Sequence, residues 1–271
     1  MKKNFMNKTA KTFTGVVLAG DRGPDDPVAQ AVGAPCKSFV PLGGRPMVLR
    51  VLDTLAEARE VDSLAVCGPS EGLLAQQPEL LSRIATGTIR WIPPQATPSA
   101  STYHVLEGLS PDASVLVTTA DHAFLTAEVV DFFCRKARAT GCDIVAGLAP
   151  HEQVMRAFPQ TKRTATRLRD GGFCSCNLFA FLTPRARNAA EFWRKCERNR
   201  KKPWRMMRVI GWPVVVRYLL GTLSLEEGLR RLSARMNVKA GVIIMPFPEV
   251  AVDVDTVSDW RWVEEVIAGR G

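Results

Sequence analysis

Residues 14–23 read TGVVLAGDRG, an apolar strand that runs directly into a turn of small residues. In such a turn the backbone N–H groups can approach a phosphate closely, and nearby fixed cations can neutralise its charge. Lys37 follows about one short loop later, just before the stretch FVPLGGRPM at 39–47. The arrangement predicts a nucleotide site at the end of this strand.

Short apolar strands alternate with helical patterns over the first 150 residues. Apolar residues at helical spacing predict helices at 46–59, 99–109 and 127–140. Apolar runs bounded by turn residues predict strands at 63–68, 89–92, 114–119 and 143–147. Strands and helices in alternation indicate an α/β fold, a mostly parallel Rossmann-like sheet covered on both faces, with ligands beyond the carboxyl ends of its strands.

The alternation becomes irregular after residue 150. A strand is expected at 175–181, a strongly basic helix at 184–202, a helix at 224–234, a strand at 241–245 and a final helix around 260–267. We therefore expect a basic N-terminal extension at 1–11 and one domain over 12–271, with a helical insertion at about 185–235.

The bulk composition is that of an ordinary globular protein, with 46% hydrophobic and 23% charged residues. Its net charge of +9 fits an anionic partner: a nucleotide, a nucleic acid or an anionic membrane. Nucleic acid is not expected, because the basic residues show no recognisable module with interleaved aromatics.

Seven scattered cysteines include no Cys-x-x-Cys pair, which argues against a zinc site. They are interpreted as free thiols in a reducing compartment. The basic N-terminus is not followed by the apolar stretch of a signal peptide, so a cytoplasmic protein is expected.

Three aspartates follow apolar strands. Asp121 comes directly after the strand at 114–119, and Asp253 and Asp255 come after the strand at 241–245. Two residues apart on an extended chain, Asp253 and Asp255 are expected to share one face. One carboxylate from each place, together with substrate phosphates, would suffice to bind Mg²⁺. A loop or capping aspartate explains Asp121 equally well.

Cations and small polar residues complete the candidate site. Arg22 and Lys37 are the candidate phosphate cations, although two solvated surface charges are the alternative. The loop QATPSAS at 95–101, which contains Ser99 and Ser101, leads into a helix and suits contact with a base or ribose.

Taken together, these motifs resemble the nucleotidyltransferases with a GT-A-like fold, in particular the molybdenum-cofactor guanylyltransferases and the sugar-phosphate nucleotidylyltransferases. The resemblance rests on LAG at 18–20 with Arg22, on Lys37, on PLGGRPM at 41–47 and on ADHAF at 120–124. It covers roughly residues 12–150 and returns at 252–259, which read VDVDTVSD.

The resemblance implies a role for each matching position. The backbone of Leu18, Ala19 and Gly20 would hold the base and the phosphates, with Ser99 and Ser101 near the nucleoside. Arg22 and Lys37 would neutralise the triphosphate. Asp121 and Asp253 would hold Mg²⁺, with Asp255 as a neighbour or substitute. An acceptor phosphate would attack the α-phosphorus of the triphosphate, and pyrophosphate would leave.

Two positions depart from the family pattern. Asp21 stands where the family usually has a second glycine, and its carboxylate would repel a triphosphate unless it faces away or binds metal. The usual Gly-Asp-x-Pro has become Ala120-Asp121-His122-Ala123. For His122 a structural hydrogen bond is favoured over a role beside the metal.

The acceptor pocket of this fold would involve residues 158–177. Lys162 or Arg163 could bind an acceptor phosphate, and Asn177 could hydrogen-bond a sugar or polyol. A solvated basic loop and a turn asparagine are the alternatives.

Residues 203–223 are long, apolar and edged with cations. Arg208 and Arg217 argue against a membrane span, because a charge at mid-bilayer costs about 2.5 kcal/mol or more. Two interpretations stay open: a buried helical hairpin or homodimer interface, and a peripheral segment at 194–220 that contacts anionic lipid at the inner membrane face.

The expected function is Mg²⁺-dependent nucleotidyl transfer from an NTP to a phosphorylated sugar, polyol or lipid-pathway intermediate. A glycosyltransferase using an NDP-sugar is the alternative enzyme, but residues 121–123 do not supply its Asp-x-Asp motif. A membrane-docked nucleotide-binding protein without catalysis is the other alternative, which Asp21 favours and Arg22, Lys37, Asp121 and Asp253 oppose.

Overall fold

The computed structural model describes residues 12–21, 23, 25–161, 163–199 and 202–269. Its central sheet has the order β10-β7-β9-β6-β1-β4-β5, with β8 paired to β9. The strands are β1 (Phe13–Leu18), β4 (Val61–Cys67), β5 (Arg90–Ile92), β6 (Ser114–Thr119), β7 (Ile144–Pro150), β8 (Thr166–Leu168), β9 (Gly171–Phe181) and β10 (Ala240–Ile244). Only β9 runs antiparallel to its neighbours in this described sheet, so the predicted mostly parallel sheet is confirmed.

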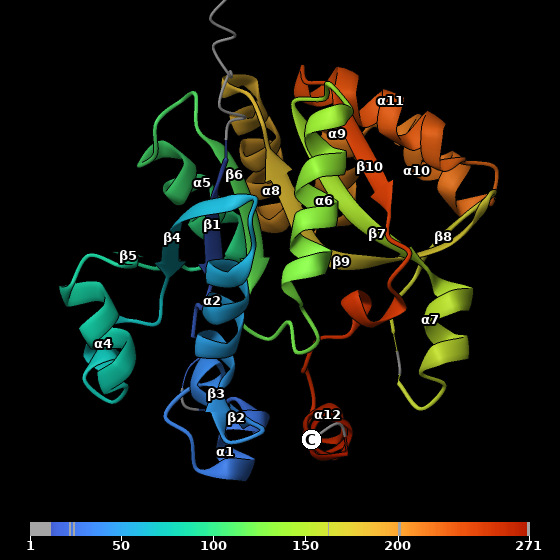
Figure 1. The fold of residues 1–271 in the computed structure, drawn as a ribbon. Helices are drawn as coiled ribbons and strands as arrows, with labels where there is room; N and C mark the ends of the chain where they lie inside the picture. Colours follow the sequence, from blue (N-terminus) through green and yellow to red (C-terminus); the bar gives the residue numbers. More distant parts are fainter. Residues whose placement is uncertain (1–11, 22, 24, 162, 200–201, 270–271) are drawn as a thin grey trace, which may run out of the picture.

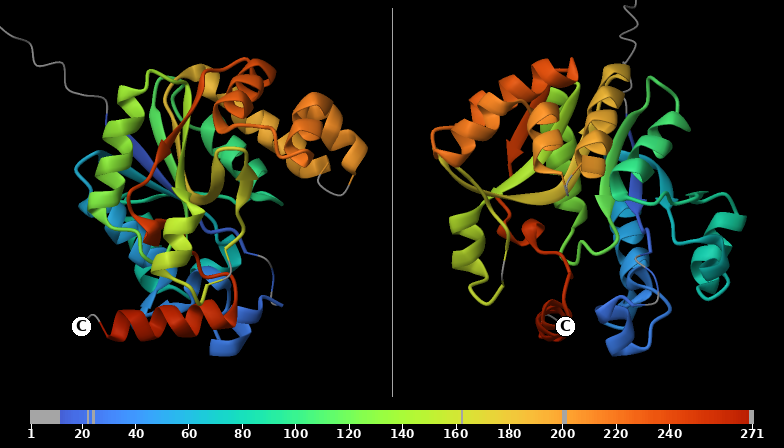
Figure 2. Two further views of the ribbon diagram at one scale, coloured as in Figure 1. Left: turned by 90° about the vertical axis from the view of Figure 1, so that its right-hand side faces the viewer. Right: turned by 180° about the vertical axis from the view of Figure 1, so that it is seen from behind.

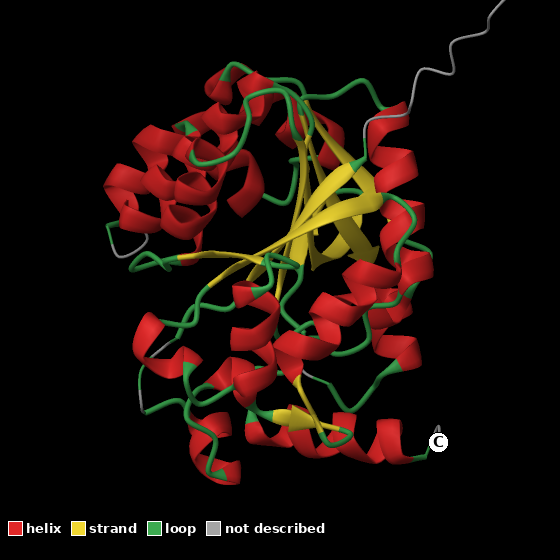
Figure 3. Ribbon diagram, turned by 60° about the vertical axis from the view of Figure 1, so that its left-hand side comes forward, coloured by secondary structure: helices red, strands yellow, loops and turns green. Residues whose placement is uncertain are grey.

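Alternate residues of β1 supply the two faces of the sheet. Phe13 and Val17 belong to the apolar cluster that includes residues of α2 (Met47–Glu57) and α6 (Ala127–Ala139). Val16 and Leu18 belong to a second cluster, with residues of α5 (Pro98–Glu107) and α8 (Arg187–Asn199). Because side chains alternate along a strand, the sheet is buried on both sides, which makes the three layers seen in Figures 1 and 3.

A third apolar cluster brings the two ends of the described chain together. It joins α1 (Pro27–Val32) and β2 (Pro41–Leu42) to α12 (Val257–Ala268), which lies beside them in Figure 1. The backbone N–H of Val254 donates to the carbonyl oxygen of Asp121 at 3.1 Å. The late acidic stretch is thereby held against the loop that follows β6.

The insertion between β9 and β10 is helical, as predicted. It contains a 3₁₀ turn η2 (Pro184–Ala186), α8, α9 (Pro203–Ile210), α10 (Trp212–Leu219) and α11 (Leu225–Met236). The chain turns at Gly211, whose φ is 103°. α8 packs against α5, whereas α9 and α10 stand away from the sheet in the left view of Figure 2.

Shorter elements complete the described chain: η1 (Lys37–Phe39), β3 (Arg45–Pro46), α3 (Glu71–Leu74), α4 (Pro78–Ala85), α7 (His151–Ala157) and η3 (Pro248–Ala251). Among the residues described, no helix combines the length and the apolar character needed to cross a membrane. The predicted extension at 1–11 lies outside the described residues.

Candidate active site

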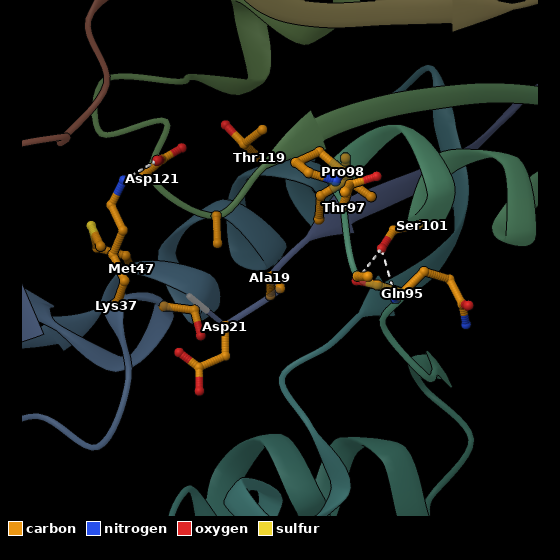
Figure 4. A pocket seen from close by; sticks show the side chains of 15 residues that line it. Ala19, Asp21, Lys37, Met47, Gln95, Thr97, Pro98, Ser101, Thr119 and Asp121 are labelled. Atoms are coloured by element: carbon orange, nitrogen blue, oxygen red, sulfur yellow. Dashed lines mark hydrogen bonds and ion pairs between the residues drawn. The ribbon is translucent and has the colours of Figure 1, made fainter. Parts of the chain in front are cut away.

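A pocket of about 400 Å³ lies where β1 and β6 end. It is lined by Leu18, Ala19, Gly20, Asp21, Lys37, Ser38, Met47, Gln95, Ala96, Thr97, Pro98, Ser101, Thr119, Ala120 and Asp121. Figure 4 shows Lys37 and Asp121 on one side of Ala19, and the loop of Gln95 and Thr97 on the other. The predicted backbone positions 18–20 therefore line a real cavity.

The turn after β1 is clamped between its two neighbouring strands. The N–H of Ala19 donates to the carbonyl of Cys67 at 2.8 Å, and the N–H of Ala120 donates to the carbonyl of Leu18 at 3.0 Å. Gly68 has a φ of 93°, and a Cβ there would lie 2.6 Å from the carbonyl oxygen of Ala19. Only glycine permits this approach. A Cβ on Gly20, by contrast, would meet no atom within 4 Å, so that the backbone there is open to a ligand.

Asp21, the departure from the family pattern, turns back onto its own loop. Its Oδ1 accepts a hydrogen bond from the N–H of Gly23 at 3.0 Å. In Figure 4 the exposed side chain points away from the ammonium of Lys37. The carboxylate lines the pocket without facing its buried cation.

Lys37 is the buried cation of the site. Its Nζ lies 2.5 Å from Oδ2 of Asp121 and 2.9 Å from Oδ1 of Asp255, and the residue is 7% exposed. Burial alone would lower the pKa of Lys37, but the two carboxylates outweigh it and the pKa is raised. Burial would likewise raise the pKa of Asp121, but the charge of Lys37 lowers it. Both groups are therefore charged at neutral pH.

The surroundings of one Asp121 oxygen indicate whether the site suits a metal. Oδ1 of Asp121 and Oγ1 of Thr119 are buried and have no hydrogen-bond partner among the described residues. The described residues contain no group of three or more Cys, His, Asp or Glu side chains that could form a metal cage. Since Mg²⁺ uses one or two carboxylates together with substrate phosphates, Asp121 with Asp255 fits an ion that binds with a triphosphate.

Asp253 and Asp255 have different partners. Residues 252–255 form no strand, and the carboxylate of Asp253 pairs with Arg163 and accepts from Nδ2 of Asn177 at 3.2 Å. In this structure, therefore, Asp255 and not Asp253 shares Lys37 with Asp121. The strand-like alternation assumed for this stretch does not apply.

Two of the candidate acceptor residues, Arg163 and Asn177, contact Asp253 and lie outside the pocket lining. The side chain of Arg163 is 7% exposed, and its Nη2 contacts the carbonyl of Asp253 at 2.7 Å and Oδ1 of Asp259 at 3.3 Å. Asn177 has a φ of 49°, as turn asparagines often do. Arg163 and Asn177 thus hold the 253–259 stretch in place. Arg22 and Lys162 lie outside the described residues.

The two candidate serines differ in direction. Ser101 lines the pocket, and its Oγ accepts from the N–H of Gln95 at 2.9 Å, which fixes the 95–98 wall (Figure 4). Ser99 is fully buried and lies outside the lining; its N–H, at 3.1 Å, and its hydroxyl both donate to Oε2 of Glu197 on α8. The structure therefore places Ser101 at the pocket and ties Ser99 to the insertion.

His122 is a structural residue. Burial lowers its pKa to about 4, so the ring is neutral. Its Nε2 lies 2.9 Å from the carbonyl of Val250, which requires an N–H there, and its Nδ1 accepts from the hydroxyl of Thr118 at 3.1 Å. The ring fastens the Asp121 loop to η3.

Some lining residues were missed by sequence reasoning. Ser38, Met47 and Thr119 face the pocket, although no role was assigned to them. Thr119 carried a usable signal, because it is the last residue of β6 and ligands bind at strand ends. Met47 lies in the stretch 41–47 that carries the family resemblance, whereas Ser38 carried no signal.

Comparison with known proteins gives a family and a fold. Residues 15–240 match the family model of the MobA-like NTP transferase domain. A comparison with curated proteins gives no match. A hypothetical transferase from Thermus thermophilus is similar over 92% of this chain and 99% of its own, with 33% identity and a TM-score of 0.74.

Two more distant structures share the architecture. A 4-diphosphocytidyl-2C-methyl-D-erythritol synthase from Anaerococcus prevotii matches 95% of this chain and 97% of its own, with 14% identity and a TM-score of 0.56. A CMP:2-keto-3-deoxy-manno-octonic acid synthetase complexed with CTP matches 96% of this chain and 100% of its own, with 12% identity and a TM-score of 0.55. At these identities the likeness shows the fold alone. The family match spans most of the described sheet, so the chain belongs to the MobA-like NTP transferase family and is a nucleotidyltransferase.

Proposed function

We propose that this nucleotidyltransferase moves a nucleoside monophosphate from an NTP onto a phosphorylated small molecule, a sugar, polyol or lipid-pathway phosphate, and releases pyrophosphate. One observation carries the proposal. The pocket joins an open backbone turn, the buried ammonium of Lys37 and the unpartnered Oδ1 of Asp121. A structure of the same fold complexed with CTP supports a triphosphate as the ligand.

The backbone and the charged side chains of the pocket would have different roles in binding a triphosphate. The turn after β1 offers the open backbone at Gly20 to phosphate oxygens, whereas the N–H of Ala19 is already bonded to the carbonyl of Cys67. Lys37 is held ready between Asp121 and Asp255, and a triphosphate oxygen can replace one of these carboxylates as its partner. Nucleotidyl transfer is favoured by a cation that is already in position, because it can stabilise the phosphate charge without moving.

Asp121 and Asp255 would hold Mg²⁺ when the nucleotide is bound. The ion would supply neutralisation of the phosphate charge and make the α-phosphorus more electrophilic. An acceptor phosphate oxygen then forms a bond to the α-phosphorus while the bond to the pyrophosphate oxygen breaks. No protein nucleophile is needed, because positioning and charge neutralisation account for the reaction.

Pyrophosphate release provides the test. Each of the four NTPs is combined with pools of sugar, polyol and lipid phosphates, with Mg²⁺ and with a chelator. We expect release with at least one pair, dependent on Mg²⁺ and lost in Asp121→Asn. Lys136→Ala, which removes an exposed cation on α6, serves as the control. Full turnover in Asp121→Asn with the best pair would contradict the site, and product formed from an NDP-sugar would show a glycosyltransferase.

A further inference from the structure

The exposed apolar side chains of the described chain are concentrated in one place. Of the eight large hydrophobic residues that are exposed, six lie between 204 and 220. They are Trp204 at 79% exposure, Trp212 at 67%, Val216 at 38%, Tyr218 at 41%, Leu219 at 76% and Leu220 at 70%. Large contiguous exposed apolar surface marks an interaction site.

Three of these side chains, Trp204, Trp212 and Val216, border one hollow between the two helices. Trp212, Val216 and Leu219 follow the i, i+4, i+7 spacing of one face of α10. Trp204, Met207 and Arg208 of α9 join Trp212, Val216 and Arg235 around a cavity of about 590 Å³. The guanidinium of Arg235 supports the turn, since its Nη1 donates to the carbonyl of Arg208 at 3.4 Å. We call this the α9–α10 surface.

Positive charge is concentrated on the segment that precedes and contains this surface. Three of its arginines, Arg205, Arg208 and Arg217, lie on α9 and α10, and Arg217 pairs with Glu227 at 3.0 Å. Residues 185–220 contain eleven Lys and Arg against two Glu, a net charge of +9, which equals the net charge of the whole chain. The two glutamates face inward or along their own helix: Glu197 accepts from Ser99, and Glu191 pairs with Arg194 and Lys195. Arg205 and Arg208 are exposed beside the two tryptophans.

We propose that the α9–α10 surface docks on an anionic lipid bilayer. Indole and aliphatic side chains enter the head-group region while neighbouring arginines meet the lipid phosphates. Each helix has eight residues and is about 12 Å long, whereas the hydrocarbon core is about 30 Å thick, so the helices lie on the membrane. This contact is independent of the proposed reaction.

Charge and apolar area argue against two other possible partners of this surface, a second copy of the chain and a nucleic acid. A second copy of the chain would bring the same positive segment to the interface, and like charges would repel. A nucleic acid would satisfy the arginines and stack on the tryptophans, but it offers nothing to Val216, Leu219 and Leu220. An anionic bilayer complements both the charge and the aliphatic stripe.

Vesicle co-sedimentation of the full chain tests the proposal. We expect binding at low salt to vesicles of equal parts phosphatidylcholine and phosphatidylglycerol, little binding to phosphatidylcholine alone, and release at high salt, where the Debye length shrinks to about 3 Å at 1 M. Trp204→Ala with Trp212→Ala should weaken binding by at least about tenfold, because two large apolar anchors are lost. Leu81→Ala, an exposed leucine at 42% on α4, should change nothing.

Two double variants with the same change in net charge test whether the arginines of this surface recognise anionic lipid. Arg205→Glu with Arg208→Glu should abolish the preference for phosphatidylglycerol. Arg59→Glu with Arg135→Glu reverses two exposed arginines elsewhere and changes the net charge equally, yet should bind as the wild type does. Equal loss in both pairs would overturn the proposal, since it would show a response to net charge and not to this surface.

A measurement on the wild type keeps the test valid if a variant misfolds. Brominated lipid chains should quench tryptophan fluorescence, and Trp204→Phe with Trp212→Phe should retain binding but lose the quenching. No binding to anionic vesicles at low salt overturns the proposal. A concentration-dependent dimer, or oligonucleotide binding, that the Trp204 and Trp212 alanine variant loses while vesicles never bind would also overturn it, and would identify the true occupant.

Discussion

The pocket and the α9–α10 surface handle charge and apolar area in opposite ways. In the pocket, a cation that is 7% exposed is matched by two carboxylates within the chain. On the α9–α10 surface, a tryptophan that is 79% exposed stands beside exposed arginines. The pocket is preorganised, so a ligand has only to exchange partners with Lys37. The surface instead leaves its apolar side chains exposed.

Contacts between α8 and α5 connect the two regions, and one of them lies beside the pocket wall. Glu197 of α8, in the insertion, accepts hydrogen bonds from Ser99 in the first turn of α5, whose N-cap Thr97 lines the pocket. The carboxylate lies where the N-terminal dipole of α5 favours a negative charge. The wall of the pocket is thus held from the same helix that leads into the α9–α10 surface.

The largest effect is expected from breaking the buried ion pair. Lys37→Met leaves Asp121, whose side chain is 17% exposed, without its cation, so we expect a loss of about 3 kcal/mol in unfolding free energy. Turnover should fall at least about a hundredfold, because a positioned cation is lost. Chemical denaturation and pyrophosphate release measure the two effects.

The double variant separates stability from chemistry. Lys37→Met with Asp121→Asn removes both charges, so most of the stability should return while turnover stays lost. Asp255, with 48% of its side chain exposed, can remain solvated. A double variant that recovers turnover would show that the pair is merely structural.

A second strong effect is expected at the turn after β1. Gly68→Ala should cost about 2 kcal/mol, because a Cβ there meets the carbonyl oxygen of Ala19 at 2.6 Å and the φ of 93° is already unfavourable for alanine. The displaced turn should also weaken NTP binding, which titration of nucleotide affinity can measure. Gly87→Ala provides the control, since its φ is 73° but its Cβ would meet nothing within 4 Å. Similar nucleotide affinity in both variants would contradict the role of the clamp.

A smaller effect is expected at the contact between α8 and α5 that lies beside the pocket wall. Glu197→Ala should lower the unfolding free energy by about 1 kcal/mol and raise the KM for the NTP a few-fold, with kcat less affected. Glu191→Ala, on the same helix but paired with Arg194 and Lys195 of that helix, should leave KM unchanged. Steady-state kinetics of the two variants distinguish a pocket wall held by α8 from a wall that stands alone.

Part of this site could be read from the residue pattern. Lys37 and Asp121 were identified because small residues and a carboxylate follow apolar strands, and parallel strands end at one edge of a sheet. The covering of both faces followed from the alternation of strands and helices along the chain, and the opposite clusters of Val16 and Val17 agree with it. These are local patterns that tertiary structure did not override.

Other features depended on tertiary placement. Which aspartate meets Lys37 could not be read from the stretch 252–255, because it forms no strand and its direction is set by Arg163 and by the capping box of α12.

The different directions of Ser99 and Ser101, by contrast, could have been predicted from the sequence. Two residues apart on a helix, they point about 200° apart, so both could not face one nucleoside. The surface exposure of α9 and α10 required the fold itself.

The smallest effect is expected from an ion pair outside both regions, which sets the scale for the buried pair. Asp53 lies 2.5 Å from Nε of Arg45 and 2.7 Å from Nη1 of Arg83, with 29% of its side chain exposed. Burial would raise the pKa of Asp53, but these hydrogen bonds and charges lower it. Because the folded-state pKa lies below the unfolded value of about 3.9, the stabilisation is fully present above that pH and disappears as pH falls through the folded pKa. Asp53→Asn should therefore cost no more than about 1 kcal/mol at neutral pH. In urea unfolding across the acidic range, wild type and variant should converge at the lowest pH. If the two unfolding free energies still differ at the lowest pH, Asp53 acts through packing. The larger effect of Lys37→Met would then reflect burial alone and not charge pairing.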